Sequence, residues 1–454
     1  MNWCRGGRSV AGVEGIDTND FELKQGVKQG SVVAPLLYAL FVDGVVDELK
    51  KEGLGVTEGG VWVGALLYAD DMVLIADNES ELKKMLKIVE KYSRMWRFRI
   101  SGKKTKVLVC GETKKERGCR RERMEAMDEC MELGWWIGGM KGERVEEVDF
   151  FKYLGVEIER EGKWCRVVER LVEKTSRLNR FLFAKGGKWS KLGCDLRRRL
   201  WENVVRPSIE YGMEIWRPNK SGTEEIEKVL LKGGRKVLGV KIDGRVPGVV
   251  VRGDLGWPKM EWRKEKLVIR YFMKLVNMNE DTNVKRFLRV RLEVFKKCRS
   301  KCRRSWLVYV EKILIKHGLI VEGLGQDEGT TLTEIQWKGW WDVVKKDLWM
   351  NECLRWKKEL EMAGKKCELY RLVKKELFRE EWLCNDSRAV GDFIRLRAGV
   401  AELREETDRW VIPKLVWEER ICESCVLNEV EDIRHFLLDC EGCVSERRNM
   451  WVEI

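Results

Sequence analysis

The sequence predicts an α+β fold for its first third, a mostly helical middle and a small metal-binding module near its C-terminus. The stretch from Val61 to Ala76 is apolar except for Asp70 and Asp71, which predicts two buried strands joined by a tight turn. After about residue 160, apolar side chains recur at helical spacing. Residues 411–454 bring cysteines and a histidine together at the spacing of a metal site.

Helices are predicted on both sides of this strand pair. Ala34-Pro35 begins the first, because proline is tolerated in the first turn of a helix, and Gly53 is suited to end it. Its buried side is expected to hold Leu36, Leu37, Leu40, Phe41, Val45 and Leu49. Asn78 and Glu81 resemble a capping box at the start of the second helix. Its buried side is expected to hold Leu82, Met85, Leu86, Val89 and Tyr92.

A second strand pair is predicted over residues 150–158, with Glu161-Gly162 as its turn. A long amphipathic helix is predicted next, because apolar residues recur at helical spacing: Val167, Val168, Leu171, Val172, Leu178, Phe181 and Leu182. Tryptophans further along could stack on bases, but their helical spacing favours packing in a core. They are Trp337, Trp340, Trp341, Trp349 and Trp356.

Composition favours a partner that carries phosphate groups. The 454 residues have a formal net charge of +13 and a pI near 9.0. Lys and Arg near a polyphosphate release condensed counterions, although a highly charged helical surface would also explain the excess. Fifteen cysteines without a secretion signal indicate reduced thiols, so we expect an intracellular protein of the nucleus or cytoplasm. No stretch reaches membrane-spanning length, so no membrane partner is expected.

Asp70 and Asp71 are the candidate catalytic groups. Burying two adjacent charges between apolar strands costs several kcal/mol unless something compensates. At a turn, neighbouring carboxylates can converge and offer the hard oxygen ligands that Mg²⁺ prefers. Two such ions can activate a primer hydroxyl and stabilise the leaving group. The alternative is a solvent-exposed hairpin turn, in which Asp is common.

Five ordered segments resemble one enzyme family. Tyr68-Ala69-Asp70-Asp71 resembles the signature of reverse transcriptases, and its surroundings resemble the non-LTR (LINE-type) retrotransposon branch. Residues 26–38 resemble the Gln-Gly loop and its helix, and residues 101–106 resemble the Asn-x-x-Lys-Thr element. Residues 151–155 resemble the primer-grip hairpin, and residues 206–216 resemble the segment after the thumb.

The resemblance implies an RNA-directed DNA polymerase acting on an RNA template, a DNA primer and deoxynucleoside triphosphates. Asp70 and Asp71 would be catalytic ligands of a two-metal Mg²⁺ site. Template and nucleotide binding would fall to Gln29, Gly30, Tyr68 and Lys104. The primer grip would be Tyr153, Leu154 and Gly155.

The chain also departs from this family. The family's third carboxylate lies on an earlier palm strand, well upstream of the Gln-Gly loop, whereas only twenty-eight residues precede Gln29. Asp17 and Asp20 lie in a glycine-rich stretch and are expected in an exposed loop. Ser101 stands where the family usually has Asn, and Ala34 stands where it often has Ser.

We therefore expect the sequence to begin inside the palm, and these residues alone to have little or no polymerase activity. A catalytically inactive nucleic-acid-binding remnant is the alternative function. A group II intron maturase or telomerase would share the Asp-Asp turn but fits the terminal motifs poorly.

A basic stripe follows the second strand pair. Its members recur every three or four residues on one helix: Arg166, Arg170, Lys174, Arg177 and Arg180. Its place is thumb-like, so the stripe predicts contacts with a nucleic-acid backbone. A solvated helix face is the competing interpretation, because Glu169 and Glu173 lie between these residues.

The C-terminal cluster predicts a zinc site. Cys422, Cys425, His435 and Cys440 supply three thiolates and one imidazole, which suit tetrahedral Zn²⁺, with Cys443 as a rival fourth ligand. The cluster resembles the Cys-Cys-His-Cys knuckle downstream of non-LTR reverse transcriptase domains. Unpaired thiols in a C-terminal hairpin remain the alternative. With the resemblance, the predicted domains are a partial palm (1–160), a thumb-like helical region (161–245), a helical connector (246–410) and a zinc knuckle (411–454).

Overall fold

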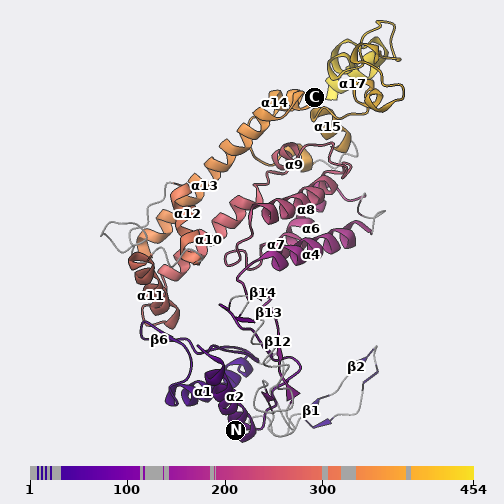
Figure 1. Cartoon of the computed structure of the whole chain (residues 1–454). Helices are drawn as coiled ribbons and strands as arrows, with labels where there is room; N and C mark the ends of the chain where they lie inside the picture. The colour runs from indigo at the N-terminus through magenta and orange to yellow at the C-terminus, as the bar shows by residue number, and fades with distance from the viewer. Residues whose placement is uncertain are drawn as a thin grey trace. The chain divides into compact units, whose positions relative to one another are not determined.

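A computed structural model describes most of the chain (Figure 1). The described residues are 8–9, 12–13, 16–17, 21–22, 32–112, 116–117, 136–137, 143–184, 189, 191–298, 305–317, 334–384 and 390–453. They divide into two compact units. Unit 1 comprises Met1–Phe151 with Asn279–Arg291, and unit 2 comprises Lys152–Met278 with Leu292–Ile454.

The predicted Asp-Asp turn of unit 1 is confirmed. Strand β7 (Ala65–Tyr68) pairs antiparallel with β8 (Asp71–Leu74), and Tyr68 lies opposite Asp71. Ala69 and Asp70 are therefore the two residues of the turn. Ala69 has a φ of 49°, the left-handed conformation that short hairpin turns require because it matches the twist of the strands.

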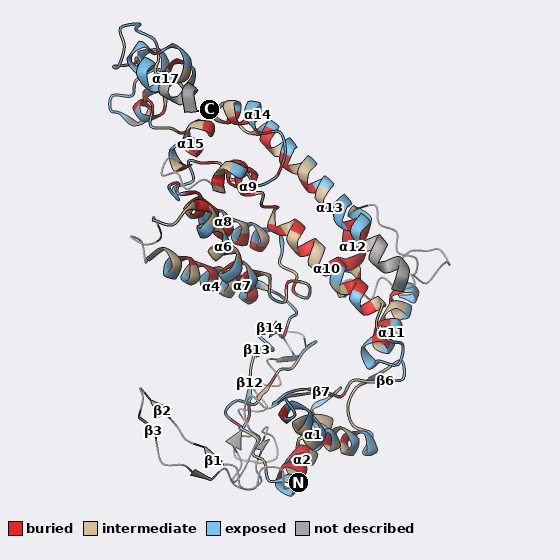
Figure 2. Cartoon of the chain, turned by 180° about the vertical axis from the view of Figure 1, so that it is seen from behind, coloured by how far each residue is buried: buried red, intermediate tan, exposed pale blue. Residues whose placement is uncertain are grey.

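Two predicted helices pack beside this hairpin and give unit 1 its core (Figure 2). They are α1 (Ala34–Lys51) and α2 (Glu79–Trp96). One half of the predicted capping box is present, because the backbone N–H of Glu81 donates to Asn78 Oδ1 at 2.9 Å. The carboxylate of Glu81 instead accepts from the backbone N–H groups of Gly55 and Asp77. The core consists of Val45, Leu49, Met85, Val89 and Tyr92.

Two expectations about burial in unit 1 are wrong. Leu36 and Leu40 are 62% and 60% exposed, because only the C-terminal half of α1 contributes to the described core. The hairpin is half-buried rather than buried (Figure 2). Alternate residues of a strand face opposite sides, so Ala65 packs on the core while Leu66 and Tyr68 remain exposed.

The other short strands of unit 1 form separate pairs. Antiparallel pairs join β1 (Arg8–Ser9) to β4 (Phe21–Glu22), β2 (Gly12–Val13) to β3 (Ile16–Asp17), β5 (Thr57–Glu58) to β6 (Val61–Trp62) and β10 (Trp136–Ile137) to β11 (Glu143–Arg144). β9 (Lys106–Val107) runs parallel to β12 (Glu146–Glu147). Asp17 was expected in a loop but lies in β3, opposite Gly12, and Asp20 lies outside the described residues.

The second predicted strand pair is present, but its turn is not where the sequence suggested. β13 (Phe150–Tyr153) pairs with β14 (Val156–Glu159), and Leu154 and Gly155 form the turn. Both have positive φ, 46° and 83°, as a two-residue type I′ turn requires. Gly162 instead follows β14.

Unit 2 is helical. Its helices are α4 (Cys165–Ala184), α6 (Cys194–Val204), α7 (Arg206–Glu210), α8 (Lys220–Leu238), α9 (Gly248–Leu255), α10 (Met260–Val276), α12 (Trp306–Lys316), α13 (Glu334–Met362), α14 (Glu368–Val373), α15 (Val390–Arg397), α16 (Arg404–Thr407) and α17 (Val444–Glu453). Helix α11 (Asn283–Lys297) includes residues of both units. The long amphipathic helix predicted from the sequence is α4, which buries Val167 and Val168. None of the described helices has the length and apolar character needed to cross a membrane.

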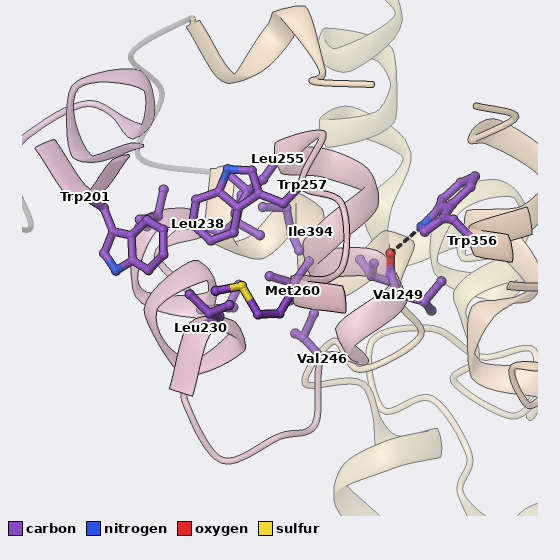
Figure 3. Close-up of a cluster of buried hydrophobic side chains, with 14 of the residues drawn as sticks. Trp201, Leu230, Leu238, Val246, Val249, Leu255, Trp257, Met260, Trp356 and Ile394 are labelled. Carbon is purple, nitrogen blue, oxygen red and sulfur yellow. Dashed lines mark hydrogen bonds between the residues drawn. The ribbon is translucent and has the colours of Figure 1, made fainter. Parts of the chain in front are cut away.

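One apolar core joins helices from α4 to α15 (Figure 3). Within it, Trp201 and Trp257 stack with ring centroids 4.4 Å apart. The indole N–H of Trp356 on α13 donates to the carbonyl oxygen of Val249 on α9 at 2.9 Å. The prediction that Trp356 packs in a core is confirmed, whereas the side chains of Trp337 and Trp340 lie outside the described residues.

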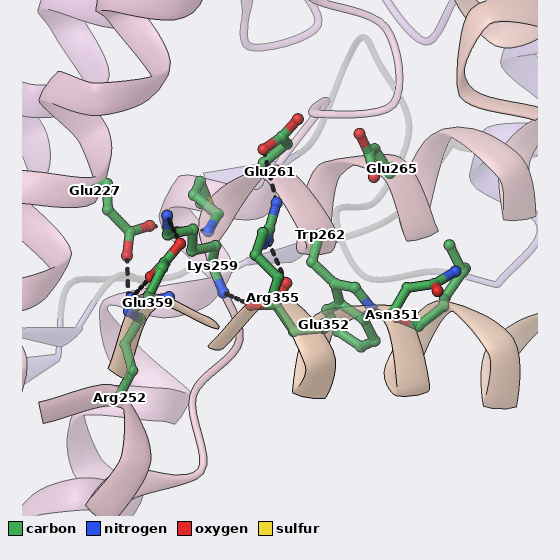
Figure 4. Close-up of polar contacts among 12 residues, drawn as sticks. Glu227, Arg252, Lys259, Glu261, Trp262, Glu265, Asn351, Glu352, Arg355 and Glu359 are labelled. Atoms are coloured by element: carbon green, nitrogen blue, oxygen red, sulfur yellow. Dashed lines mark hydrogen bonds and ion pairs between the residues drawn. The ribbon is translucent and has the colours of Figure 1, made fainter. Parts of the chain in front are cut away.

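Charged side chains attach α13 to its neighbours (Figure 4). Glu359 of α13 forms ion pairs with Arg252 of α9 and with Lys259. One turn earlier, Arg355 donates to Glu261 of α10 at 2.8 Å. Arg252 is almost fully buried, so its pairing offsets the cost of removing a guanidinium from water.

Candidate functional site

The β7–β8 turn presents two carboxylates to solvent. Asp70 is the second turn residue and Asp71 the first residue of β8, and both are exposed. Neighbouring residues within a strand would point to opposite faces, but a turn allows both carboxylates to lie at the tip of the hairpin. Both carboxylates are exposed, as in the solvent-exposed hairpin turn that the sequence left open as the alternative, and a hydrated Mg²⁺ could reach them. Their assignment as metal ligands stays a prediction.

Two tyrosines accompany these carboxylates. Tyr68 is 63% exposed on the open face of the hairpin, beside Asp71 in the register. Tyr38 comes from α1, and both its partial burial and the negative charge of Asp70 raise the pKa of its phenol. Tyr38 therefore lies within electrostatic range of the turn. The sequence did not single out Tyr38, because no local pattern links α1 to the hairpin.

The predicted nucleotide-binding residues are described only in part. Gln29 and Gly30 lie outside the described residues. Lys104 is exposed in a turn in which its backbone N–H donates to the carbonyl oxygen of Ser101 at 3.2 Å. Ser101 replaces the family's usual Asn, yet its backbone still closes the turn.

Tyr153 ends β13, and Leu154 and Gly155 form the turn of the β13–β14 hairpin. The hydroxyl of Tyr211 donates to the carbonyl oxygen of Leu154 at 2.7 Å and so stabilises the turn. A Cβ atom on Gly155 would lie 2.9 Å from the Tyr211 ring, so the close approach requires glycine. Sequence reasoning placed Tyr211 in a family-like segment but did not predict this contact.

The basic stripe lies on α4 and is largely exposed. Arg166, Lys174, Arg177 and Arg180 are exposed, and Arg170 is half-buried. Arg170 forms an ion pair with Glu157 of β14. Arg177 lies 3.8 Å from Glu173, one helical turn away. These pairs support the solvated-face interpretation for two members of the stripe.

The C-terminal cysteines and histidine converge on one point. The ligand atoms of Cys422, Cys425, His435 and Cys440 all lie within 4.8 Å of one another, and among the described residues no other group of this kind is found. Cys422 Sγ and Cys440 Sγ are 3.8 Å apart. Two thiolates on one tetrahedral Zn²⁺ with Zn–S distances of about 2.3 Å would be about 3.8 Å apart. Cys443, the rival ligand, lies outside this group.

Backbone hydrogen bonds hold the ligands in place. The N–H of Cys422 donates to the carbonyl oxygen of Glu429 at 2.9 Å, and the N–H of Cys440 donates to that of His435 at 2.7 Å. Burial raises the pKa of Cys422 to about 11, so a thiolate there needs a nearby cation. The chemistry of the donors thus fits zinc.

His435 has a partner on each ring nitrogen. Nε2 lies 3.3 Å from Cys425 Sγ, and Nδ1 lies 3.1 Å from a carboxylate oxygen of Glu429. Burial favours the neutral ring, but the hydrogen bonds to Glu429 and Cys425 leave the pKa of His435 raised. Sequence reasoning did not single out Glu429, because its role depends on the hairpin that returns it to the histidine.

Comparison with known proteins agrees with this arrangement. Residues 8–158 match the family described as reverse transcriptase (RNA-dependent DNA polymerase). The polyprotein of the type-2 retrotransposable element R2DM of Drosophila melanogaster is 24% identical over 277 residues, which are 60% of this chain and 24% of the relative. The RNA-directed DNA polymerase from mobile element jockey of the same species is 22% identical over 280 residues, 58% of this chain and 27% of the relative.

A third relative is similar over the same extent. The polyprotein of the type-1 element R2 of Popillia japonica is 23% identical over 274 residues, 60% of this chain and 42% of the relative. The family match is therefore limited to residues 8–158, and the relatives that the chain resembles come from retrotransposable elements, in agreement with the resemblance to non-LTR reverse transcriptases. It spans between about a quarter and two fifths of the length of these relatives.

Proposed function

We propose that the chain is part of an RNA-directed DNA polymerase that adds deoxynucleotides to the 3′-hydroxyl of a DNA primer on an RNA template, with the low activity of these residues alone that the sequence predicts. The proposal rests on the β7–β8 turn, which exposes Asp70 and Asp71 at the tip of a hairpin. This hairpin lies within residues 8–158, which match the reverse transcriptase family. Bound there, Mg²⁺ would supply positive charge beside the triphosphate and the primer hydroxyl. Lys104 would add a cation for the triphosphate, and Tyr68 an aromatic surface beside the metal ligands.

Nucleic-acid contacts are proposed for two elements of unit 2. The β13–β14 turn at Tyr153, Leu154 and Gly155 would hold the primer, and the exposed cations of α4 would contact the backbone of the hybrid. The terminal cluster would bind one Zn²⁺ that stabilises residues around Cys422 and His435. Because the chain is rich in cysteines and described ones such as Cys194 and Cys353 are free thiols, we place its action in a reducing compartment, nucleus or cytoplasm.

Metal and nucleotide binding test the role of the turn separately from turnover. The chain, Asp70→Asn/Asp71→Asn and the control Asp77→Asn are mixed with poly(rA)/oligo(dT), dTTP and Mn²⁺, and bound Mn²⁺ is measured by electron paramagnetic resonance. Asp77 is exposed just after β8 and is a matched carboxylate outside the turn. We expect the double variant alone to lose the ternary Mn²⁺ site.

Primer extension with Mg²⁺ is measured in the same samples. Weak extension by the chain and by Asp77→Asn, absent from the double variant, would support polymerisation at this turn, and robust extension would contradict the expectation that these residues alone have little or no activity. Hybrid binding without extension would favour the nucleic-acid-binding remnant. Extension that survives loss of both carboxylates would overturn the assignment.

A further inference from the structure

The C-terminal module differs in charge from the rest of the chain. Residues 411–454 contain ten Asp and Glu residues and only five Lys and Arg residues, whereas the whole chain has a net charge of +13. Three thiolates and a neutral imidazole around one Zn²⁺ would add a further negative charge. A surface of this sign repels a phosphate backbone rather than attracting it.

Two of the module's five cationic side chains are already engaged by protein groups. Arg420 is buried and donates to the carbonyl oxygens of Glu405 and Leu415 at 2.7 and 3.0 Å. Arg447 donates to the carbonyl oxygen of Phe436 at 3.4 Å. The side chain of Arg434 is 80% exposed and its guanidinium lies 3.7 Å from the carboxylate of Asp439, a distance at which both groups stay open to solvent.

Exposed apolar side chains flank the ligand cluster. Val426 and Leu427 directly follow Cys425 and are 87% and 41% exposed, and Leu438, 59% exposed, lies two residues before Cys440. Because the ligand atoms lie within 4.8 Å of one another and consecutive Cα atoms are only about 3.8 Å apart, the backbone of these three residues passes close to the same cluster. Large exposed aliphatic groups that gather in one place are typical of an interaction surface.

Carboxylates alternate with these apolar groups along the chain. The side chain of Glu423, between Cys422 and Cys425, is 81% exposed, and that of Asp439 beside Leu438 is 45% exposed. Glu423 forms an ion pair with Arg404 at 2.7 Å, yet its exposure leaves it open to a second cation. The result is an apolar surface with an acidic border.

We propose that the metal-binding module is a docking surface for a protein segment that combines Lys or Arg with aliphatic side chains. The cations of the partner would meet Glu423 and Asp439, while its aliphatic groups would cover Val426 and Leu438. Charge complementarity favours this partner over single-stranded RNA. The proposal uses the zinc site proposed above only to hold the two segments together.

The test uses the full chain and three fluorescent probes: a helical peptide of Lys and Leu, the same peptide with Glu for Lys, and a 20-nucleotide single-stranded RNA. Affinity is measured by anisotropy for the chain and for Val426→Ser/Leu438→Ser. The control Leu372→Ser changes an exposed aliphatic residue of α14, outside residues 411–454. Removing two aliphatic contacts should weaken the Lys/Leu peptide about tenfold or more.

The Glu/Leu peptide should not bind the module, and the RNA affinity should be the same for the double variant and the control. Equal affinity of the double variant and the chain for the Lys/Leu peptide would overturn the proposal. So would a selective loss of RNA affinity, or self-association of the chain that the double variant abolishes. Zinc content is measured in every sample, so a failure of metal binding is distinguished from a failure of docking.

Discussion

At the scale of single residues, the ring of His435 is held from both sides. The Nδ1–Glu429 contact of 3.1 Å fixes which nitrogen carries the proton and leaves Nε2 for the metal. We expect Glu429→Leu to lower zinc affinity about 10- to 100-fold, since outer partners of metal-bound histidines have effects of that size. Competition with a chromophoric chelator measures the change.

Glu423→Gln is the matched control for Glu429→Leu. Glu423 lies in the same hairpin but pairs with Arg404 rather than with a ligand. Its replacement should leave zinc affinity unchanged, and equal losses in the two variants would argue against an orienting role for Glu429.

A second residue-scale feature is the buried carboxylate of Asp254. Burial raises its pKa to about 6, although Arg397 and a 2.8 Å hydrogen bond from Tyr370 favour the charged form. A folded-state pKa above the unfolded value stabilises the fold fully below about pH 4, and this contribution is lost as the pH rises through about 6. Asp254→Asn removes the titrating group.

We expect the free energy of unfolding of the wild type, relative to Asp254→Asn, to fall by about 2 to 3 kcal/mol between pH 4 and pH 7. Urea unfolding of both proteins across this range measures it. A difference that rises with pH, or does not change, would contradict the raised pKa.

At the scale of elements, α4 turns one face to the core and a basic face to solvent. Arg166, Lys174 and Arg180 are its exposed cations other than Arg177, which lies near Glu173. Each phosphate contact contributes about 0.7–0.9 to the slope of log K against log salt. Replacing the three by Gln should therefore reduce that slope for an RNA–DNA hybrid by about 2, measured by anisotropy at several salt concentrations.

The α4 variant needs a comparison at equal charge. Lys220, Lys228 and Lys232 lie on α8, and their replacement by Gln removes the same number of charges. An equal reduction of the slope in both triple variants would indicate a general charge effect and not a binding face.

The packing of α9 against α13 and α14 depends on a small residue. A Cβ atom on Gly253 would lie 2.2 Å from the hydroxyl oxygen of Tyr370 and 2.8 Å from the Trp356 ring. Gly253→Ala should therefore destabilise unit 2 by about 1–3 kcal/mol through overpacking, measured by urea unfolding. Gly364→Ala, which would meet nothing within 4 Å, should change stability little, and equal losses would contradict the packing argument.

At the scale of the whole molecule, the two parts of unit 2 depend on different forces. The core around Trp201 and Trp356 buries many large apolar groups, whereas the segment around Cys422 has few. We expect chelation of zinc to remove hydrogen-exchange protection from the amides of Cys422 and Cys440 and to leave that of Val250 on α9 unchanged. Protection that persists at Cys422 after complete metal removal would contradict a folding role for zinc.

The sequence predicted the positions of turns and helices better than the burial of their side chains. The turn at Asp70 and Asp71, the cap at Asn78 and the helix α4 depend on local spacing, and all three are present. The burial of Leu36 and Leu40 was predicted wrongly, because an apolar stripe shows which face of a helix can be buried but not how far its neighbours cover it.

Residue spacing along the chain is a local property, so the Asp-Asp turn, the basic stripe of α4 and the grouping of Cys422, Cys425, His435 and Cys440 could be predicted from the sequence. Contacts between distant residues depend on how the chain folds. Glu429 behind His435 and the burial of Asp254 beneath Tyr370 are two such cases. In each case, a charged side chain acts through a partner that is brought close only by folding. Periodicity in the sequence does not show such a partner.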